Sequence, residues 1–264
     1  MIGNASLRLV QAATLSAALM MSTSAFAQDE TTRQLTEHLL AVEALSTFGE
    51  NLKELISTDI GFSEAQVTQW SSAVDVAFDR DTLEAEFFAA LDSRLSDPVR
   101  QAALDYQTSP LGVEVFERVN SAPSNADAPH LVDEAKTYLE EASDERRALH
   151  EAHFEAESGS AQYSASLEGY FRAMKIAAAP ILGEAAAEQW VTDAQYLREV
   201  YAENSFLTSV SIYSQMPEER HEELVAHVTT PEVTAFYSLS TEALAETINA
   251  ALDRVEAAYA DGSN

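Results

Sequence analysis

The sequence predicts an all-α protein in which two tandem, duplicated helical-bundle units follow a signal peptide. Three observations support this: apolar residues recur every three or four positions along most of the chain, only 8 Gly and 7 Pro interrupt 264 residues, and one residue pattern occurs twice. Apolar spacing of three and four is that of a single helix face, and no segment shows sustained alternation with the period of two that is typical of a strand. We therefore expect essentially no β-sheet.

Residues 1–27 are predicted to be a signal peptide. Arg8 precedes an apolar run, and Ala25 and Ala27 flank Phe26 in an A-x-A cleavage pattern. Cleavage after Ala27 predicts a periplasmic or secreted protein. A retained membrane anchor is the alternative, although the apolar run is shorter than the roughly 20 residues that span a bilayer. No later segment reaches that length without charge, so we expect no integral membrane span in the mature chain.

The first helical unit is expected over residues 28–122. An apolar stripe with helical spacing covers about residues 31–57, and Gly61 ends that helix. Polar side chains that favour helix N-caps stand before the following helices. These candidate helix starts are Ser63 with Gln66, Asp81 with Glu84, Ser96 before Pro98, and Ser109 before Pro110. Proline fits there because its missing N–H has no partner in the first turn of a helix.

Residues 123–158 are expected to form a linker and a charged connecting helix. The segment 121–129 is small, polar and contains two Pro, which is typical of a linker. The charged helix that follows has a candidate break at Ser143. The second unit is then expected over 159–264, with helices near 161–178, 184–200, 204–215, 217–228 and 231–259.

The second unit repeats a pattern of the first. The repeated residues, in order, are Phe48, Lys53, Trp70 and Pro110 in the first copy and Phe171, Lys175, Trp190 and Pro231 in the second. A repeat of this length predicts two similar folding units and not a solenoid, because solenoid periods run about 20–50 residues.

The segment 104–112 carries a family resemblance. It resembles the signature of a bacterial secreted family known only as a domain of unknown function, in which a helix ending in an aromatic residue is followed by Ser-Pro-x-Gly. The matching residues are Tyr106, Ser109, Pro110 and Gly112, and the second copy keeps Thr230 and Pro231 but has Val233 in place of the Gly. The resemblance implies small helical periplasmic units, of which the second has diverged, and it implies no activity.

The turn at Ser109 also has a direct physical interpretation. The Ser caps a helix, Pro110 presets its first turn, and Gly112 lets another helix come close. The alternative is functional, with the free N–H groups of the turn holding an anion.

The composition excludes several classes of function. With 44 acidic and 15 basic residues, the formal net charge is −29, which disfavours binding to nucleic acids and to anionic lipid headgroups. The absence of Cys excludes disulfides, thiol catalysis and Cys-based metal sites. The acidic surface serves solubility in one interpretation, and attracts a basic partner or cations in the other.

His150 and His153 are the candidate metal ligands. They lie three residues apart on one helical face, with Glu157 one turn beyond, and such a set could share a metal ion. The spacing is not that of H-E-x-x-H. The alternative is an exposed charged helix that carries two His. His221 and His227 are expected at the surface.

The repeated Trp and Lys residues are candidate ligand-binding residues. Trp70 and Trp190 could line a pocket, although a large side chain repeated in two units is more often part of each core. Lys53 and Lys175 could bind a carboxylate-bearing ligand, or each could form a salt bridge to an adjacent helix.

The sequence contains no phosphate loop, no G-x-S-x-G and no calcium loop, so nothing in it argues for catalysis. It therefore predicts a non-catalytic periplasmic binding or interaction protein whose partner is an unknown protein or a small apolar ligand, with no cofactor. The first alternative is a carrier of an apolar small molecule between the two units. The second is a metal-dependent hydrolase that uses His150 and His153.

Overall fold

The computed structural model describes residues 32, 35, 41–58, 61–121 and 128–261. This part of the chain forms twelve helices and no strand, which confirms the all-α prediction. Among the described residues, no helix combines the length and apolar character needed to cross a bilayer. The predicted signal peptide and most of the predicted linker lie outside the described residues.

The helices of the first half are α3 (Ala41–Lys53), α4 (Glu64–Ala77), α5 (Arg80–Asp92), α6 (Asp97–Thr108) and α7 (Pro110–Asn120). The connecting helices are α8 (Ala128–Glu141) and α9 (Asp144–Ala156). The helices of the second half are α10 (Gly159–Leu182), α11 (Glu184–Asp193), α12 (Leu197–Tyr213), α13 (Glu218–Val228) and α14 (Pro231–Asp261).

Most of the predicted helix starts are observed. The Ser63 hydroxyl accepts a bond from the Gln66 backbone N–H, and the Gln66 side chain bonds back to the Ser63 backbone, which completes the capping box. Ser143 caps α9 and so separates it from α8, as its position predicted. The prediction for α5 was wrong by two residues: Asp79, not Asp81, is the N-cap and accepts a bond from the Thr82 backbone N–H.

Helix α10 is longer than the sequence indicated. We expected it to end near residue 178, before Pro180, but it continues through Pro180 to Leu182. Proline has no backbone N–H, so it removes one hydrogen bond of the helix. Because Pro180 lies only two residues before the last residue of α10, few later hydrogen bonds of the helix are affected. The helix ends at Gly183, whose φ of +83° is a conformation that only glycine adopts readily.

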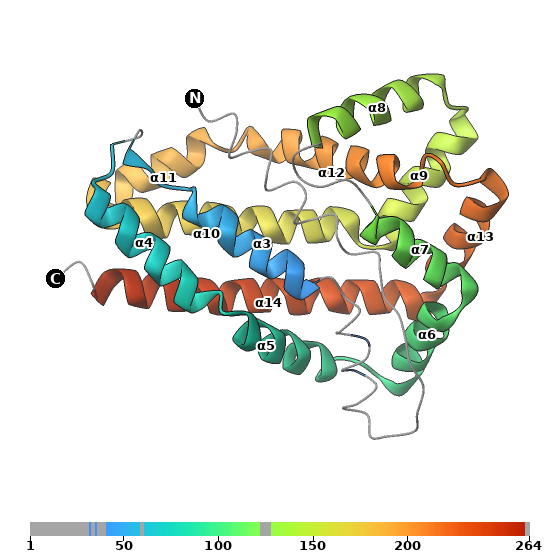
Figure 1. Cartoon of the computed structure of the whole chain (residues 1–264), viewed down its shortest axis with the longest axis horizontal. Coiled ribbons are helices and arrows are strands. Elements are labelled where there is room, and N and C mark those ends of the chain that lie inside the picture. The colour runs from blue at the N-terminus through green and yellow to red at the C-terminus, as the bar shows by residue number, and fades with distance from the viewer. Residues whose placement is uncertain (1–31, 33–34, 36–40, 59–60, 122–127, 262–264) are drawn as a thin grey trace.

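Two long helices, α10 and α14, run side by side through the molecule (Figure 1). Helix α14 also packs against α4, α5 and α6 of the first half, and α10 packs against α11, α12 and α3. The main core gathers around these contacts, and its largest fully buried side chains are Trp70, Phe48, Phe87, Phe236 and Leu52. A smaller core at the other end of α14 contains Tyr106, Tyr213, Leu224, Val228 and Tyr237.

The order of elements is the same on either side of α8 and α9. The first half runs α3 to α7 and the second runs α10 to α14, and in each half the Trp lies on the second helix. A Ser-Pro or Thr-Pro step begins the fifth helix of each half. The two fifth helices differ in length, with 11 residues in α7 and 31 in α14.

Candidate functional site

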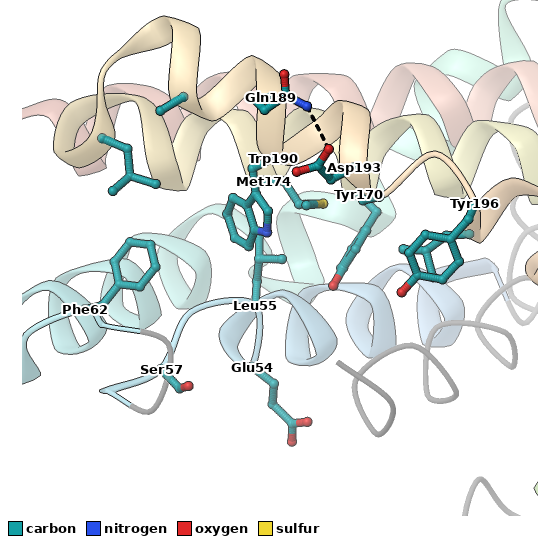
Figure 2. A pocket seen from close by; sticks show the side chains of 14 residues that line it. Glu54, Leu55, Ser57, Phe62, Tyr170, Met174, Gln189, Trp190, Asp193 and Tyr196 are labelled. Carbon is teal, nitrogen blue, oxygen red and sulfur yellow. Dashed lines mark hydrogen bonds between the residues drawn. The ribbon is translucent and has the colours of Figure 1, made fainter. Parts of the chain in front are cut away.

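A pocket of about 540 Å³ lies between the segment that follows α3 and the pair α10 and α11 (Figure 2). Leu55 and Phe62 come from the segment after α3, whereas Tyr170 and Met174 come from α10 and Trp190 from α11. Ligand pockets in proteins usually measure about 300–1,000 Å³ and have mostly apolar walls. The pocket therefore has the size and wall chemistry of a small-molecule site.

Two glycine turns shape the walls of this pocket. Gly61, with a φ of +99°, precedes Phe62 in the segment after α3, and Gly183 reverses the chain between α10 and α11. Leu182 and Tyr196, one on each side of α11, are each 53% exposed, so apolar surface continues outward at the rim. Large exposed apolar side chains of this kind are typical of binding sites when they adjoin a cavity.

The two repeated Trp residues differ in their surroundings. Trp70 is fully buried, donates a hydrogen bond of 2.6 Å from Nε1 to the Leu52 carbonyl, and meets the Tyr259 ring edge-on at 5.4 Å. Trp190 is half-buried and lines the pocket. Of the two candidate ligand-binding Trp residues, the structure therefore places only Trp190 at a cavity, and Trp70 is a core residue.

The two repeated Lys residues form ion pairs outside the pocket walls. Lys53 Nζ pairs with Glu50 at 2.8 Å and also with Asp75 on α4. Lys175 Nζ lies 3.0 Å from Glu188, on α11. Each Lys thus joins the first helix of its half to the second, as the salt-bridge alternative described.

Polar groups of the pocket lie mainly at its rim. Gln189 Nε2 donates a hydrogen bond of 2.7 Å to Asp193 Oδ1, drawn as a dashed line in Figure 2. Glu54 extends from the opposite wall, and both carboxylates are exposed. Burial, together with neighbouring Tyr196, raises the pKa of Tyr170 to about 12, so its hydroxyl remains neutral.

A second group of polar side chains is buried at the other end of the molecule, where α9 packs on α13. His150 and His153 are 2% and 0% exposed, so the alternative of an exposed helix was wrong. The prediction that His221 lies at the surface was also wrong, because it is 0% exposed. His227 is half-buried and its ring stacks on Tyr106 at 5.0 Å.

Four buried side chains, His150, His153, His221 and Glu157, together with the half-buried Tyr138, form what we call the histidine cluster. His221 Nε2 lies 3.1 Å from His153 Nδ1, so one of the two nitrogens donates a hydrogen bond to the other. His153 Nε2 lies 3.2 Å from Glu157 Oε1, within ion-pair distance although not aligned for a hydrogen bond. His150 Nε2 lies 3.3 Å from the Tyr138 hydroxyl and its ring meets His221 edge-on at 4.6 Å.

Burial keeps the imidazoles of His150 and His221 neutral. It lowers the pKa of His150 to about 4, with the positive charge of Arg146 adding to the effect. Burial lowers the pKa of His221 to about 2, and the neighbouring His153 and His150 contribute further. The adjoining hydroxyls of Tyr213 and Tyr237 have pKa values raised well above the usual range, first by burial.

The histidine cluster does not have the geometry of a metal centre. Within the described residues, no three or more His, Asp or Glu side chains converge so as to hold a metal ion. The predicted ligands His150 and His153 face different neighbours, Tyr138 and His221 respectively. The arrangement therefore buries His150 and His221 as neutral imidazoles, whose protonation in acid destabilises the fold.

The Ser-Pro-x-Gly turn is a close helix-to-helix junction. The Ser109 hydroxyl accepts a hydrogen bond of 3.0 Å from the Gly112 N–H. A Cβ at Gly112 would collide with the Tyr106 carbonyl oxygen and lie 3.1 Å from Gln107 Cα, so only glycine fits. In the second half the Thr230 hydroxyl donates to the His227 carbonyl at 2.8 Å, and the larger Val233 is accommodated and buried.

Sequence reasoning missed most of the pocket, including Leu55, Phe62, Tyr170, Met174 and Tyr196. These residues come from segments more than a hundred positions apart, and no local pattern joins them. Comparisons of the chain with protein-family models, with curated proteins and with solved structures give no match.

Proposed function

We propose that this chain is an exported, non-catalytic binding protein whose pocket beside Trp190 holds an apolar small molecule. One observation supports this above all others: a cavity of about 540 Å³ with mostly apolar walls opens to solvent next to a half-buried Trp. Apolar walls and an exposed apolar rim cost stability when they face water, and a bound apolar ligand would offset that cost.

The origin of the two halves is part of the proposal. We infer that residues 28–122 and 159–264 descend from one duplicated unit, joined by 123–158. The shared order of helices and the matched Lys ion pairs favour this history. The pocket then lies between the halves, because the segment after α3 belongs to the first and α10 and α11 to the second. Membership of the secreted helical family is favoured by the tight turn at Ser109, and export by the leader at residues 1–27.

A neutral apolar dye tests the binding function. N-phenyl-1-naphthylamine, which brightens in apolar surroundings, is titrated into the chain from residue 28 onward, and native mass spectrometry counts the bound molecules. We expect saturable binding of one molecule. Ala186→Phe, which places a ring in the pocket wall, should weaken binding at least about tenfold, since one such side chain displaces ligand volume.

Ala185→Phe is the matched control, because Ala185 is an exposed neighbour on the same helix that does not line the pocket. If Ala185→Phe binds the dye with wild-type affinity and Ala186→Phe binds it more weakly, the result supports dye binding in this pocket. Absence of saturable binding to the wild-type protein, or equal loss in both variants, would contradict the proposed function.

A further inference from the structure

We propose that the pocket selects cationic amphiphiles, such as alkylammonium compounds, over carboxylates and phosphates of the same chain length. This selectivity rests on the proposed function, because it specifies the class of ligand for the same pocket. Three features lead to it: the sign of the charges at the rim, the aromatic faces beside them, and the way in which nearby cationic side chains are held elsewhere.

The charges at the pocket are of one sign. Fourteen described residues line it, and those that carry a charge are Glu54 and Asp193, with no Lys, Arg or His among the fourteen. Figure 2 shows the Asp193 carboxylate above the cavity between Trp190 and Tyr170. Figure 2 also shows the Glu54 carboxylate pointing away from Trp190 and Tyr170, so Asp193 is the charge beside these rings, and it would repel a carboxylate or phosphate ligand and attract a cation.

Aromatic rings line the same cavity as the Asp193 carboxylate. Trp190, Tyr170 and Tyr196 all line the same cavity (Figure 2). The faces of aromatic rings carry partial negative charge and attract cations, most strongly for Trp, and cages of such rings bind quaternary ammonium groups. Because Tyr170 remains a neutral phenol, with its pKa raised to about 12, it contributes an aromatic face and a hydroxyl.

The nearest lysines in sequence do not reverse this polarity. Lys53 precedes Glu54 but pairs with Glu50 and Asp75. Lys175 follows Met174 but pairs with Glu188 of α11, and Glu184 lies 3.7 Å from the same amine. Both amines are therefore held by pairs of carboxylates, and neither contributes to the pocket wall.

The inner part of the pocket is suited to an alkyl chain. Leu55, Phe62 and Met174 are buried, uncharged side chains that line the pocket. An apolar tail would remove this surface from water, while its cationic end would stay at the exposed rim beside Asp193. The net charge of −29 adds a field that raises the local concentration of cations.

Three ligands with one eight-carbon chain test the selectivity: octyltrimethylammonium, octanol and octanoate, each below its micelle concentration. Their affinities are measured by displacement of N-phenyl-1-naphthylamine at low salt and in 0.5 M NaCl. We expect the ammonium compound to bind at least about tenfold more tightly than octanoate, with octanol between them, and the ratio to fall in high salt.

Asp193→Asn should reduce the ratio of ammonium to octanoate affinity at least about threefold and leave octanol unchanged. Glu222→Gln, which removes an exposed carboxylate of α13 outside the pocket wall, is the charge-matched control and should leave the ratio unchanged. Octanol binding with no preference for the cation would overturn the selectivity while the proposed function stands. Failure of the dye and of all three ligands to bind would overturn both.

Discussion

Acidification should destabilise this protein through the histidine cluster. The pKa of His150 is lowered to about 4 and that of His221 to about 2, whereas an imidazole in the unfolded chain titrates near 6.5. A depressed pKa of a base means that the unfolded state binds protons first, so the free energy of unfolding falls as the pH drops below about 6.5. The loss continues until the pH reaches the folded-state pKa of each residue.

The size of the effect follows from these values. Between pH 7.5 and pH 5, each of the two residues lowers the free energy of unfolding by about 2 kcal/mol, and together they lower it by about 4 kcal/mol. This is a large share of the 5–15 kcal/mol that stabilises an ordinary domain. The net charge of −29 acts in the opposite direction, because protonation of carboxylates relieves their mutual repulsion.

Urea unfolding followed by circular dichroism at pH 7.5, 6.5, 5.5 and 5.0 measures the effect. His150→Gln and His221→Gln, singly and combined, remove the titrating groups, so each single variant should lose about half of the pH dependence relative to wild type. His130→Gln, at an exposed position on α8, is the control and should retain the wild-type pH dependence. The reasoning would be refuted if wild type and the double variant showed equal changes in stability between pH 7.5 and pH 5.

Three further outcomes are expected in the same unfolding assay at pH 7.5. Gly112→Ala should cost about 1–3 kcal/mol because its Cβ would meet the backbone of the preceding helix; an unchanged free energy of unfolding would argue against the collision. Trp70→Ala should cost about 3–5 kcal/mol, and Trp190→Ala clearly less because it is already half-exposed; the reverse order would contradict the assignment of core and pocket. Lys175→Met should change stability by less than about 1 kcal/mol because its ion pairs are exposed to solvent, and a larger loss would show a structural role for that amine.

The parts of the fold that depend on neighbouring residues were predictable from the sequence. The capping box at Ser63, the cap at Ser109 and the break at Ser143 follow from hydrogen bonds that each residue makes within three positions. His221 was misplaced because the prediction considered only its spacing of six residues to His227, which puts the two side chains on different helix faces. Its spacing to Leu224 and Val228, three and seven residues on, is that of one buried helix face, and this signal outweighs the composition of the segment.

The pocket was not predictable from the sequence, because its position depends on which helices pack against one another. Its walls come from residues near 55–62 and 170–197, and their proximity results from the packing of α10 against α3. The sequence places Trp70 and Trp190 at equivalent positions of the repeat. No neighbouring residue indicates that Trp70 is buried in the core whereas Trp190 lines a pocket. That distinction is made by a third helix, distant from both in the chain.

The lengths of the two fifth helices explain why only one Trp opens on a cavity. Helix α14 has 31 residues and is about 46 Å long, so it reaches back along the molecule to α4, where Tyr259 packs on Trp70 (Figure 1). Helix α7 has 11 residues and is about 16 Å long, and it ends among α6 and α12 without reaching α11. Under the proposed duplication, a single ancestral position therefore became a core residue where a long helix covers it. In the same proposal this position became a pocket wall where the helix is short, so the difference in helix length separates the two environments without any change in the Trp itself.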